Sequence, residues 1–305
     1  MRLKSTLAFK FKNLNCILML LNQTLNFFIQ IKVEMTGLSE LVFVGLGLSS
    51  EKDISLKGLE EIKTANHVFI ETYTSFMPNL SIERLEKLCG KRPEIVSRRE
   101  LEEENGEKIL NAAIKGKAVL LVPGDPLIAT THIALRIQAE KRGIKTRIVH
   151  GASIISAAIG LSGLHNYKFG KSVTIPFPES DYLPETPYHV IWQNKQLGLH
   201  TLCLLDIKAE KKMFMTIKQA IEVLRKLEEK IGKKLISSET LAVGIARAGS
   251  EDSIVKAGTL KELESHDFGG PPHTLIFPGK LHFMEAEALK VLAGASEESL
   301  KKLIE

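Results

Sequence analysis

The chain has few of the features that define several common classes of protein. Its three cysteines, Cys16, Cys89 and Cys203, are too widely spaced in 305 residues for a disulfide framework or a paired-cysteine metal site. Cys203 lies in an apolar run, where a thiol usually fills space in a core. This cysteine usage fits a reducing compartment, and we expect the protein to be cytoplasmic.

Motifs for metal binding and covalent catalysis are also missing. The sequence has no His-x-x-x-His pair and no acidic triplet at metal spacing, so we expect no metal site. It lacks Gly-x-Ser-x-Gly and the Walker pattern, and no set of nucleophile and base stands out. The sequence therefore leaves the catalytic residues unknown.

The positive charge of the chain is concentrated at its N-terminus. Residues 1–34 hold five basic residues and one acidic residue, whereas the remainder holds 36 Lys and Arg against 35 Asp and Glu. A nearly neutral body lacks the concentrated basic face that binding to nucleic acid requires. The longest apolar run of the leader, residues 16–21, is far too short to span a bilayer. We therefore expect neither a nucleic-acid nor a membrane partner.

Residues 1–40 are expected to stand apart from the fold. A basic leader that is poor in acidic residues is typical of a signal or transit peptide. A simpler interpretation is that Met35 is the true start and that residues 1–34 are translated upstream sequence. We favour the simpler interpretation because the first core strand begins only six residues after Met35. We expect residues 1–40 to be disordered or not translated.

From residue 41 onward, predicted strands alternate with predicted helices. Short apolar runs such as residues 41–44 and 117–122 are typical of buried strands, and stripes at helical spacing lie between such runs. The alternation predicts an α/β fold with a mainly parallel sheet. The glycine-bearing segment 163–171 precedes a half with more strand character. We therefore expect two domains, 41–165 with a mainly parallel sheet and 166–305 with a mixed sheet.

Two helices of the first domain are predicted in some detail. Residues 101–115 are expected to form one longer, charged helix. Residues 131–142 are expected to form a helix whose inward face carries Ile133, Ala134 and Ile137.

Gly45 and Gly47 directly follow the strand at 41–44. Glycine lets a ligand approach the backbone closely, and a strand followed by Gly-x-Gly begins a dinucleotide-binding fingerprint. The third glycine of that fingerprint is replaced by Ser50, although Glu71 lies where the ribose-binding acid is expected. The pattern is compatible with a plain tight turn or with a ligand-binding loop.

Asp125 stands at the carboxyl end of the strand 117–122, where open α/β sheets bind their ligands. Pro123 and Pro126 fix the backbone on both sides of it, and it lies too far ahead of the next helix to cap it. We therefore assign it a binding role, in which a rigid carboxylate suits a ribose diol or a cationic group. Three polar residues are candidates for the same cleft, although the histidine is equally compatible with a solvated role: Thr130, Thr131 and His132.

Two further segments carry candidate binding groups. The strand-to-helix turn at 151–154 has free amides that can bind the polar edge of a ligand, although Ser153 would serve equally as an N-cap. His273 follows Pro271 and Pro272, which orient it as the other two prolines orient Asp125. A purely structural histidine is equally compatible with this pattern.

Together these segments resemble the tetrapyrrole methylase superfamily. The resemblance rests on Val-Phe-Val-Gly-Leu-Gly-Leu at 42–48, Asp-Ile-Ser at 53–55, and Pro-Gly-Asp-Pro-Leu with Ala-Thr-Thr-His within 123–132. A finer similarity, to the diphthine synthase family, covers the chain from about residue 41 to the end. It rests on five further segments: 167–172, 198–201, 205–210, 246–250 and 271–273.

The resemblance implies a homodimer in which two α/β domains hold S-adenosyl-L-methionine in the cleft between them. It also implies which residues contact that cofactor, since each falls in a segment that matches a family motif. Carried over motif by motif, these contacts are Leu48, Asp125, Ile128, Ser153, Ile154, Leu204 or Leu205, Ala248 and His273.

The resemblance also implies a reaction. The amino group of a 3-amino-3-carboxypropyl adduct, on one histidine of translation elongation factor 2, would be methylated to diphthine, an intermediate of diphthamide. Archaeal members place three methyl groups on nitrogen, and eukaryotic members add a methyl ester. The adduct carries a carboxylate, so a cation nearby is expected. Four residues are candidates: Lys168, Lys171, Lys208 and Arg247.

Three alternatives stay open at this level. A corrin or precorrin C-methyltransferase would share the glycine and Gly-Asp-Pro elements but should lack the Asp-Ile-Lys-Ala-Glu segment at 206–210. A nicotinamide-dependent oxidoreductase would be built on Gly45 and Gly47, but it needs the missing third glycine. A non-catalytic protein that binds the elongation factor would keep a docking surface without binding the methyl donor.

Overall fold

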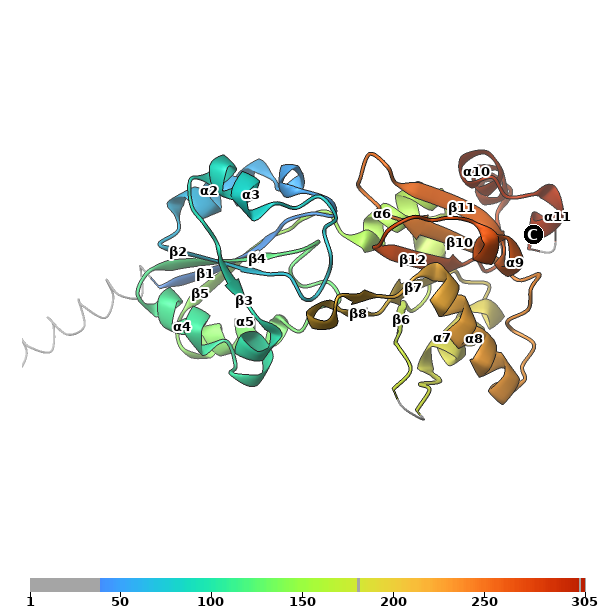
Figure 1. The fold of residues 1–305 in the computed structure, drawn as a ribbon, viewed down its shortest axis with the longest axis horizontal. Helices are drawn as coiled ribbons and strands as arrows, with labels where there is room; N and C mark the ends of the chain where they lie inside the picture. The colour runs from blue at the N-terminus through green and yellow to red at the C-terminus, as the bar shows by residue number, and fades with distance from the viewer. Residues whose placement is uncertain (1–38, 180–181, 302, 305) are drawn as a thin grey trace, which may run out of the picture.

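The computed structural model describes residues 39–179, 182–301 and 303–304. Two five-stranded sheets lie side by side, each covered by helices, and a small hairpin that includes β8 lies between them (Figure 1). The alternation of strands and helices predicted from the sequence is confirmed, and the fold is α/β. The expectations for the N-terminal leader fall outside the described residues, apart from its last two positions.

The first sheet is parallel throughout, as predicted. Its strands lie in the order β3-β2-β4-β1-β5, which places β1 beside β4 near the middle and sends β5 to the opposite side of β1. The strands are Glu40–Gly45 (β1), His67–Glu71 (β2), Glu94–Val96 (β3), Lys117–Val122 (β4) and Lys145–Val149 (β5). The helices around them are Leu56–Thr64 (α2), Ile82–Cys89 (α3), Glu107–Ile114 (α4) and Ile133–Lys141 (α5).

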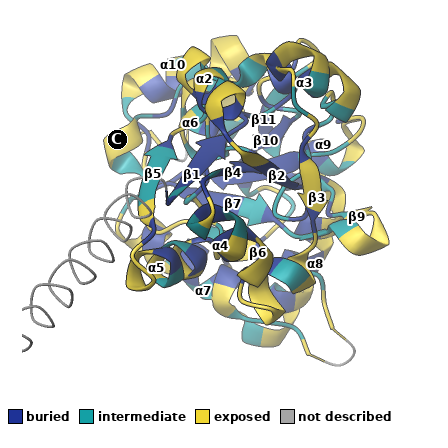
Figure 2. Ribbon diagram, turned by 90° about the vertical axis from the view of Figure 1, so that its left-hand side faces the viewer, coloured by how far each residue is buried: buried dark blue, intermediate teal, exposed yellow. Residues whose placement is uncertain are grey.

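Both faces of the first sheet are buried because neighbouring residues of a strand point to opposite sides. On β1, Leu41 and Phe43 join the core cluster beneath α4 and α5, whereas Val42 and Val44 join the cluster beneath α2 and α3. The central strands are accordingly buried, while the helices turn exposed faces outward (Figure 2). The continuous apolar run at 119–122 is the consequence of this two-sided burial.

The second sheet is mixed, as predicted. Its order is β11-β10-β12-β7-β6, in which β6 and β7 are parallel and the other pairs are antiparallel. The strands are Val173–Ile175 (β6), Thr201–Leu205 (β7), Leu241–Ala246 (β10), Ile254–Thr259 (β11) and His273–Phe277 (β12), and Ile207–Lys208 (β8) pairs with Met213–Phe214 (β9). The helices are Ile154–Ser162 (α6), Thr186–Gln196 (α7), Ile217–Ile231 (α8), Leu260–Ser265 (α9), Phe283–Ala293 (α10) and Glu297–Leu300 (α11).

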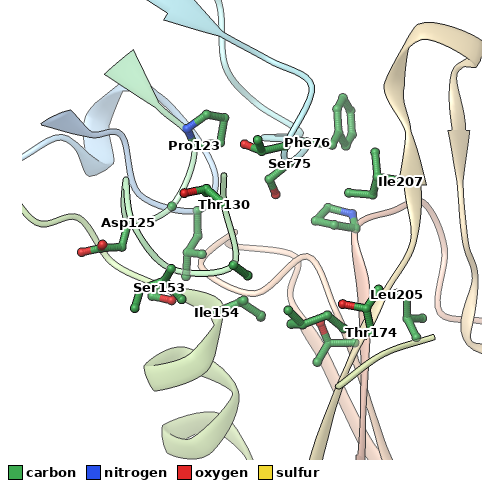
Figure 3. A pocket seen from close by; sticks show the side chains of 18 of the residues that line it. Ser75, Phe76, Pro123, Asp125, Thr130, Ser153, Ile154, Thr174, Leu205 and Ile207 are labelled. Carbon is green, nitrogen blue, oxygen red and sulfur yellow. The ribbon is translucent and has the colours of Figure 1, made fainter. Parts of the chain in front are cut away.

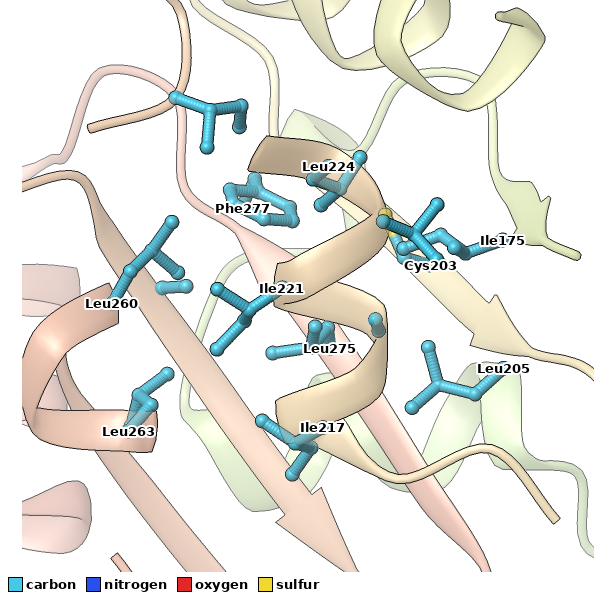
Figure 4. Close-up of a cluster of buried hydrophobic side chains, with 14 of the residues drawn as sticks. Ile175, Cys203, Leu205, Ile217, Ile221, Leu224, Leu260, Leu263, Leu275 and Phe277 are labelled. Carbon is cyan, nitrogen blue, oxygen red and sulfur yellow. The ribbon is translucent and has the colours of Figure 1, made fainter. Parts of the chain in front are cut away.

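The second sheet has an apolar core on each face. On one face, α8 presents Ile217, Ile221 and Leu224 to Leu275 and its neighbours (Figure 4). On the other face, α6 packs together with α10, and Ala158 of α6 lies in the same cluster as residues of β7 and β12. From α6 onward, the helices and strands pack into the cores of the second sheet. The division into two domains at 165/166 stays a prediction.

The prediction of one helix over residues 101–115 is wrong. A single π-helical turn, Arg99–Glu103, is followed by a break, and α4 begins at Glu107. Asn105 and Gly106 have φ values of 54° and 65° in the break, a left-handed conformation that ends a right-handed helix.

The predicted inward face of α5 is also wrong. Ile133 and Ile137 are 49% and 47% exposed, and Ala134 is exposed as well. Leu135 and Ala139 are buried in their place. The buried face of α5 is therefore rotated about the helix axis from the face that the isoleucines predicted.

Candidate active site

One cavity brings together the residues that the family resemblance assigns to the cofactor. It encloses about 260 Å³ between the carboxyl-end loops of the first sheet and the strands β6, β7 and β12 of the second (Figure 3). In the close-up, Asp125, Ser153 and Ile154 lie on one side, and Thr174 and Leu205 lie on the other. All the assigned positions line it: Leu48, Asp125, Ile128, Ser153, Ile154, Leu204, Leu205, Ala248 and His273.

The loops after β1 and β4 are joined to each other at this cavity. The amide of Gly124 donates to the carbonyl of Gly47 at 2.6 Å, and the amide of Gly47 donates back at 3.3 Å. A Cβ on Gly45 would lie 2.5 Å from the carbonyl oxygen of Gly124, so the two backbones approach as only glycine permits. The glycines after β1 thus allow the two loops to contact each other closely, which brings Asp125 beside Leu48.

The amides of the glycine-rich loop already have an anionic partner. Oδ2 of Asp53 accepts hydrogen bonds from the amides of Leu48, Ser49 and Ser50 at 3.2, 2.6 and 3.2 Å. In a dinucleotide site, amides at this turn bind the pyrophosphate instead. Because an internal carboxylate occupies them here, the loop is not a phosphate-binding loop, which counts against a nicotinamide-dependent oxidoreductase.

Glu71 does not serve as the ribose-binding acid. Its side chain is fully buried and accepts hydrogen bonds from the amides of Tyr73 and Thr74 at 2.9 and 3.0 Å. His132 lies 3.3 Å from its Oε1 and is 2% exposed, so this histidine is neither solvated nor in the cavity. Thr130 and Thr131 do line the cavity, as predicted.

Asp125 is buried at the cavity wall and firmly held. Its Oδ1 accepts the amide of Leu127 at 3.2 Å, and its Oδ2 accepts a hydrogen bond from Nδ1 of His150 at 2.7 Å. The structure confirms that it does not cap α5, because His132 occupies that position. Each carboxylate oxygen keeps a second lone pair for a ligand.

Ser153 combines the two roles that the sequence left open. It is the N-cap of α6, where its Oγ accepts the amide of Ile155 at 3.2 Å, and it also lines the cavity together with Ile154. The amino end of α6 is therefore turned toward the cavity.

His273 lines the cavity, but its ring is committed to the protein. Nδ1 accepts the amide of Ile217 at 3.3 Å, so Nε2 carries the proton that is donated to the carbonyl of Gly270 at 3.0 Å. Burial lowers the pKa of His273, an effect that the Gly270 carbonyl opposes and the nearby Arg247 guanidinium reinforces. A neutral ring with both nitrogens engaged is poorly placed to accept a proton from a substrate.

Several lining residues were not predicted from the sequence. The loop after β2 contributes Tyr73, Thr74, Ser75 and Phe76, and the hydroxyl of Tyr73 is buried without a hydrogen-bond partner among the described residues. The sequence could have indicated part of this, because the loop follows a strand of the parallel sheet and so must lie at the same edge as Asp125. Other lining residues that were not predicted include Arg98, Glu102, Thr174, Asp206 and Ile207.

The charges on the cavity wall favour a cationic ligand. Among the described lining residues, the carboxylates are Glu102, Asp125 and Asp206, and the one Lys or Arg is Arg98. S-adenosylmethionine carries a sulfonium cation and an ammonium beside one carboxylate. A wall with excess negative charge and many apolar side chains therefore fits this donor better than it fits a pyrophosphate.

The four cations proposed for the substrate carboxylate do not lie in this cavity. Nζ of Lys168 pairs with the buried Glu285 at 3.0 Å, and Lys171 is exposed elsewhere. The guanidinium of Arg247 is bound to Asp252 and to the carbonyls of Phe268 and Gly270. Lys208 lies beside the cavity residue Ile207, but its Nζ pairs with Glu179 at 3.1 Å.

The described residues contain no group of three or more His, Cys, Asp or Glu side chains placed to hold a metal ion. No helix in the same ranges is long and apolar enough to cross a membrane. Cys203 is fully buried, and burial raises the pKa of its thiol, in line with its predicted place in the core.

Comparison with known proteins gives the same assignment as the fold and the site. The family model of the tetrapyrrole (corrin/porphyrin) methylases matches residues 40–264. Diphthine synthase of Methanocella arvoryzae is 49% identical over 254 residues, which cover 83% of this chain and 98% of that protein. Diphthine synthase of Methanosarcina mazei is 48% identical over 268 residues, covering 86% and 99%.

Solved structures agree with these relatives. A crystal structure of diphthine synthase superposes with a TM-score of 0.79 at 45% identity and covers 87% of this chain and all of that one. A crystal structure of a putative diphthine synthase from Entamoeba histolytica gives a TM-score of 0.77 at 35% identity, covering 85% and 99%.

The paired α/β sheets and the cavity between them define an S-adenosylmethionine-dependent methyltransferase of the tetrapyrrole methylase class. Within that class, the chain belongs to the diphthine synthase family, whose members act in diphthamide biosynthesis.

Proposed function

We propose that this enzyme methylates the amino group of the 3-amino-3-carboxypropyl-histidine of translation elongation factor 2 and so forms diphthine. Its identity of almost one half with diphthine synthases over most of the chain supports this acceptor. The Asp-Ile-Lys-Ala-Glu segment, in which a corrin methyltransferase should differ, contributes Asp206 and Ile207 to the cavity wall.

The observation that carries the proposal is the convergence of distant segments on one cavity. Leu48, Asp125, Ser153, Leu204 and His273 come from five separate stretches of the chain and line the same space of about 260 Å³. In the proposed complex, these residues hold S-adenosyl-L-methionine, together with Ile128, Ile154 and Ala248. The wall around them carries the excess of carboxylates that a cationic donor requires.

The bound donor supplies a methyl group that its sulfonium already activates. The protein must therefore align the acceptor nitrogen with the methyl group and keep water away, and it needs no strong acid. The apolar side chains of Leu48, Ile128 and Leu204 provide the dry wall. The amine must arrive as the free base, because an ammonium has no lone pair with which to attack. His273, with both ring nitrogens engaged, is not its base.

We further propose that the enzyme is a cytoplasmic homodimer that binds no nucleic acid or membrane. Helix α10 supports the dimer, because it exposes Phe283, Met284, Val291 and Leu292, each more than half accessible in the single chain. Large apolar side chains gathered on one helix are typical of protein interfaces. Light scattering on the purified chain tests this point, with twice the monomer mass expected.

The proposed chemistry has a direct test in two parts. Calorimetry with S-adenosylhomocysteine and with NAD should give binding of the first compound only. Tritiated S-adenosylmethionine should then transfer label to elongation factor 2 that carries the unmethylated adduct, and to no precorrin substrate. Binding of NAD alone, or labelling of a precorrin and not of the factor, would overturn the proposal.

A further inference from the structure

A second cavity adjoins the first one. It encloses about 530 Å³ between the loop after β2, the segment 95–100 and the hairpin of β8 and β9. The two cavities share five wall residues: Tyr73, Ser75, Phe76, Arg98 and Pro123. A substrate side chain that enters the second cavity would reach the donor cavity at this shared wall.

Arg98 is the one Lys or Arg in that shared wall. Its guanidinium lies against a neighbouring ring but is not engaged in hydrogen bonds with the described residues. The central carbon of the guanidinium lies 5.2 Å from the centre of the Tyr73 ring, a cation–π contact that favours this position of the group. Its Nε lies 3.7 Å from Oε2 of Glu102, which is too long for a hydrogen bond. Within the part of the chain that the structure describes, the guanidinium donates no hydrogen bond.

Two other arginines of the chain are fully engaged by protein partners. The guanidinium of Arg147 donates to both Glu40 and Glu61, and that of Arg247 donates to two carbonyls and to Asp252. Such side chains have structural partners that would compete with a ligand. Arg98 is half exposed, lies over a buried ring beside the carboxylate of Glu102, and donates none of its five N–H groups in a hydrogen bond within the described residues.

We propose that Arg98 binds the carboxylate of the 3-amino-3-carboxypropyl group and thereby selects the substrate. This inference rests on the proposed function. The planar fork of a guanidinium matches a carboxylate with two parallel hydrogen bonds. In the adduct, the amino and carboxylate groups share one carbon atom, so binding the carboxylate also fixes the nitrogen that attacks.

The same contact acts on the protonation of the amine. A cation next to an ammonium disfavours the charged form, whereas an uncompensated carboxylate favours it. By pairing with the carboxylate, Arg98 removes that stabilisation and adds its own positive charge. More of the amine is then present as the free base that methyl transfer requires.

The test compares Arg98→Gln, Arg98→Lys and the control Arg99→Gln. Arg99 is the next residue, it pairs with Glu104 at 3.1 Å, and it does not line either cavity. Methyl transfer to elongation factor 2 with the adduct is measured at varied factor concentration and pH. Calorimetry with S-adenosylhomocysteine is run on each variant, and circular dichroism checks the fold.

We expect Arg98→Gln to raise the KM for the factor by roughly tenfold or more, the scale of losing charge-assisted hydrogen bonds. Its acid limb of kcat should move to higher pH, whereas Arg98→Lys should keep the limb and lose part of the affinity. Donor affinity should stay within about twofold in all variants. An unchanged KM and pH profile in Arg98→Gln would overturn the inference, as would an equal loss of donor affinity. Absence of transfer by the wild-type enzyme would instead overturn the proposed function.

Discussion

The carboxylate of Asp125 is anchored by the ring of His150, with 2.7 Å between Oδ2 and Nδ1. The histidine side chain is 74% exposed, whereas that of Asp125 is 7% exposed. An exposed ring thus holds a buried carboxylate at the end of β4, where it faces the cavity. This arrangement makes Asp125 a fixed acceptor for the donor molecule, and it leads to the first prediction.

Asp125→Ala should weaken donor binding by roughly tenfold or more, the scale of losing a charge-assisted hydrogen bond. Calorimetry with S-adenosylhomocysteine measures this loss, and thermal unfolding shows whether the variant is folded. Glu251→Ala is the matched control, since Glu251 is an exposed acid outside the cavity. Unchanged donor affinity in a folded Asp125→Ala enzyme would refute the assignment of this loop.

Removing the hydroxyl of Tyr73 should stabilise the protein. The hydroxyl is buried without a hydrogen-bond partner among the described residues, and an unsatisfied polar group of this kind costs about 1 kcal/mol or more. Tyr73→Phe keeps the ring beneath Arg98 and should raise the free energy of unfolding by about 1 kcal/mol. Denaturant titration measures the change. A loss of stability would mean that the hydroxyl has a partner, such as an ordered water molecule.

Alanine substitutions at two glycines should lower the free energy of unfolding by different amounts, although both positions have positive φ. Gly47 and Gly124 have φ values of 82° and 70°, so an alanine at either site costs about 1 kcal/mol in backbone strain. A Cβ at Gly47 would also lie 2.4 Å from Cβ of Asp53, whereas a Cβ at Gly124 would meet nothing nearer than 3.9 Å. Gly47→Ala should therefore be less stable than Gly124→Ala by about a further 1 kcal/mol. Equal unfolding midpoints would contradict the described loop contact.

The buried Glu285 should make stability depend on acidic pH. Burial by itself raises the pKa of this carboxyl, but hydrogen bonds from the amides of His165 and His282 and from Lys168 and His200 bring it down to about 2. Its contribution is then complete above the ordinary value of 4.5 and is lost as the pH falls toward 2.

Glu285→Gln should lower the free energy of unfolding by about 3 kcal/mol at neutral pH, because it leaves the largely buried Lys168 ammonium without its anion. The difference from the wild type should shrink as the pH falls from about 4.5 toward 2. Denaturant titration at several pH values measures both quantities. A difference that stays constant over this range would show that Glu285 is not the ionised centre of the cluster.

Much of the architecture is encoded locally and could be predicted. The strand predicted at 117–122 has the bounds of β4, and Asp125 could be placed because a proline-rich turn follows this continuous apolar run. The resemblance of short motifs to the family then added predicted site residues from both halves of the chain. All of those residues line one cavity.

The wrong phase of α5 and the overlooked Arg98 both depend on contacts between residues far apart in sequence. The phase of α5 follows the burial of His132 against Glu71, a pairing over 61 positions that outweighs the apolar pattern of Ile133 and Ile137. Arg98 lies in a charged segment that is typical of a solvated surface, and only the folded loop after β2 places it over Tyr73.

The central claim is that this enzyme transfers methyl groups to the modified histidine of elongation factor 2. The most direct measurement is the mass of the modified peptide after the chain is incubated with S-adenosylmethionine and factor that carries the unmethylated adduct. We expect a gain of three methyl groups, or four if a methyl ester is also made. No gain in mass, with binding of S-adenosylhomocysteine intact, would contradict the claim and assign the fold to another methyl acceptor.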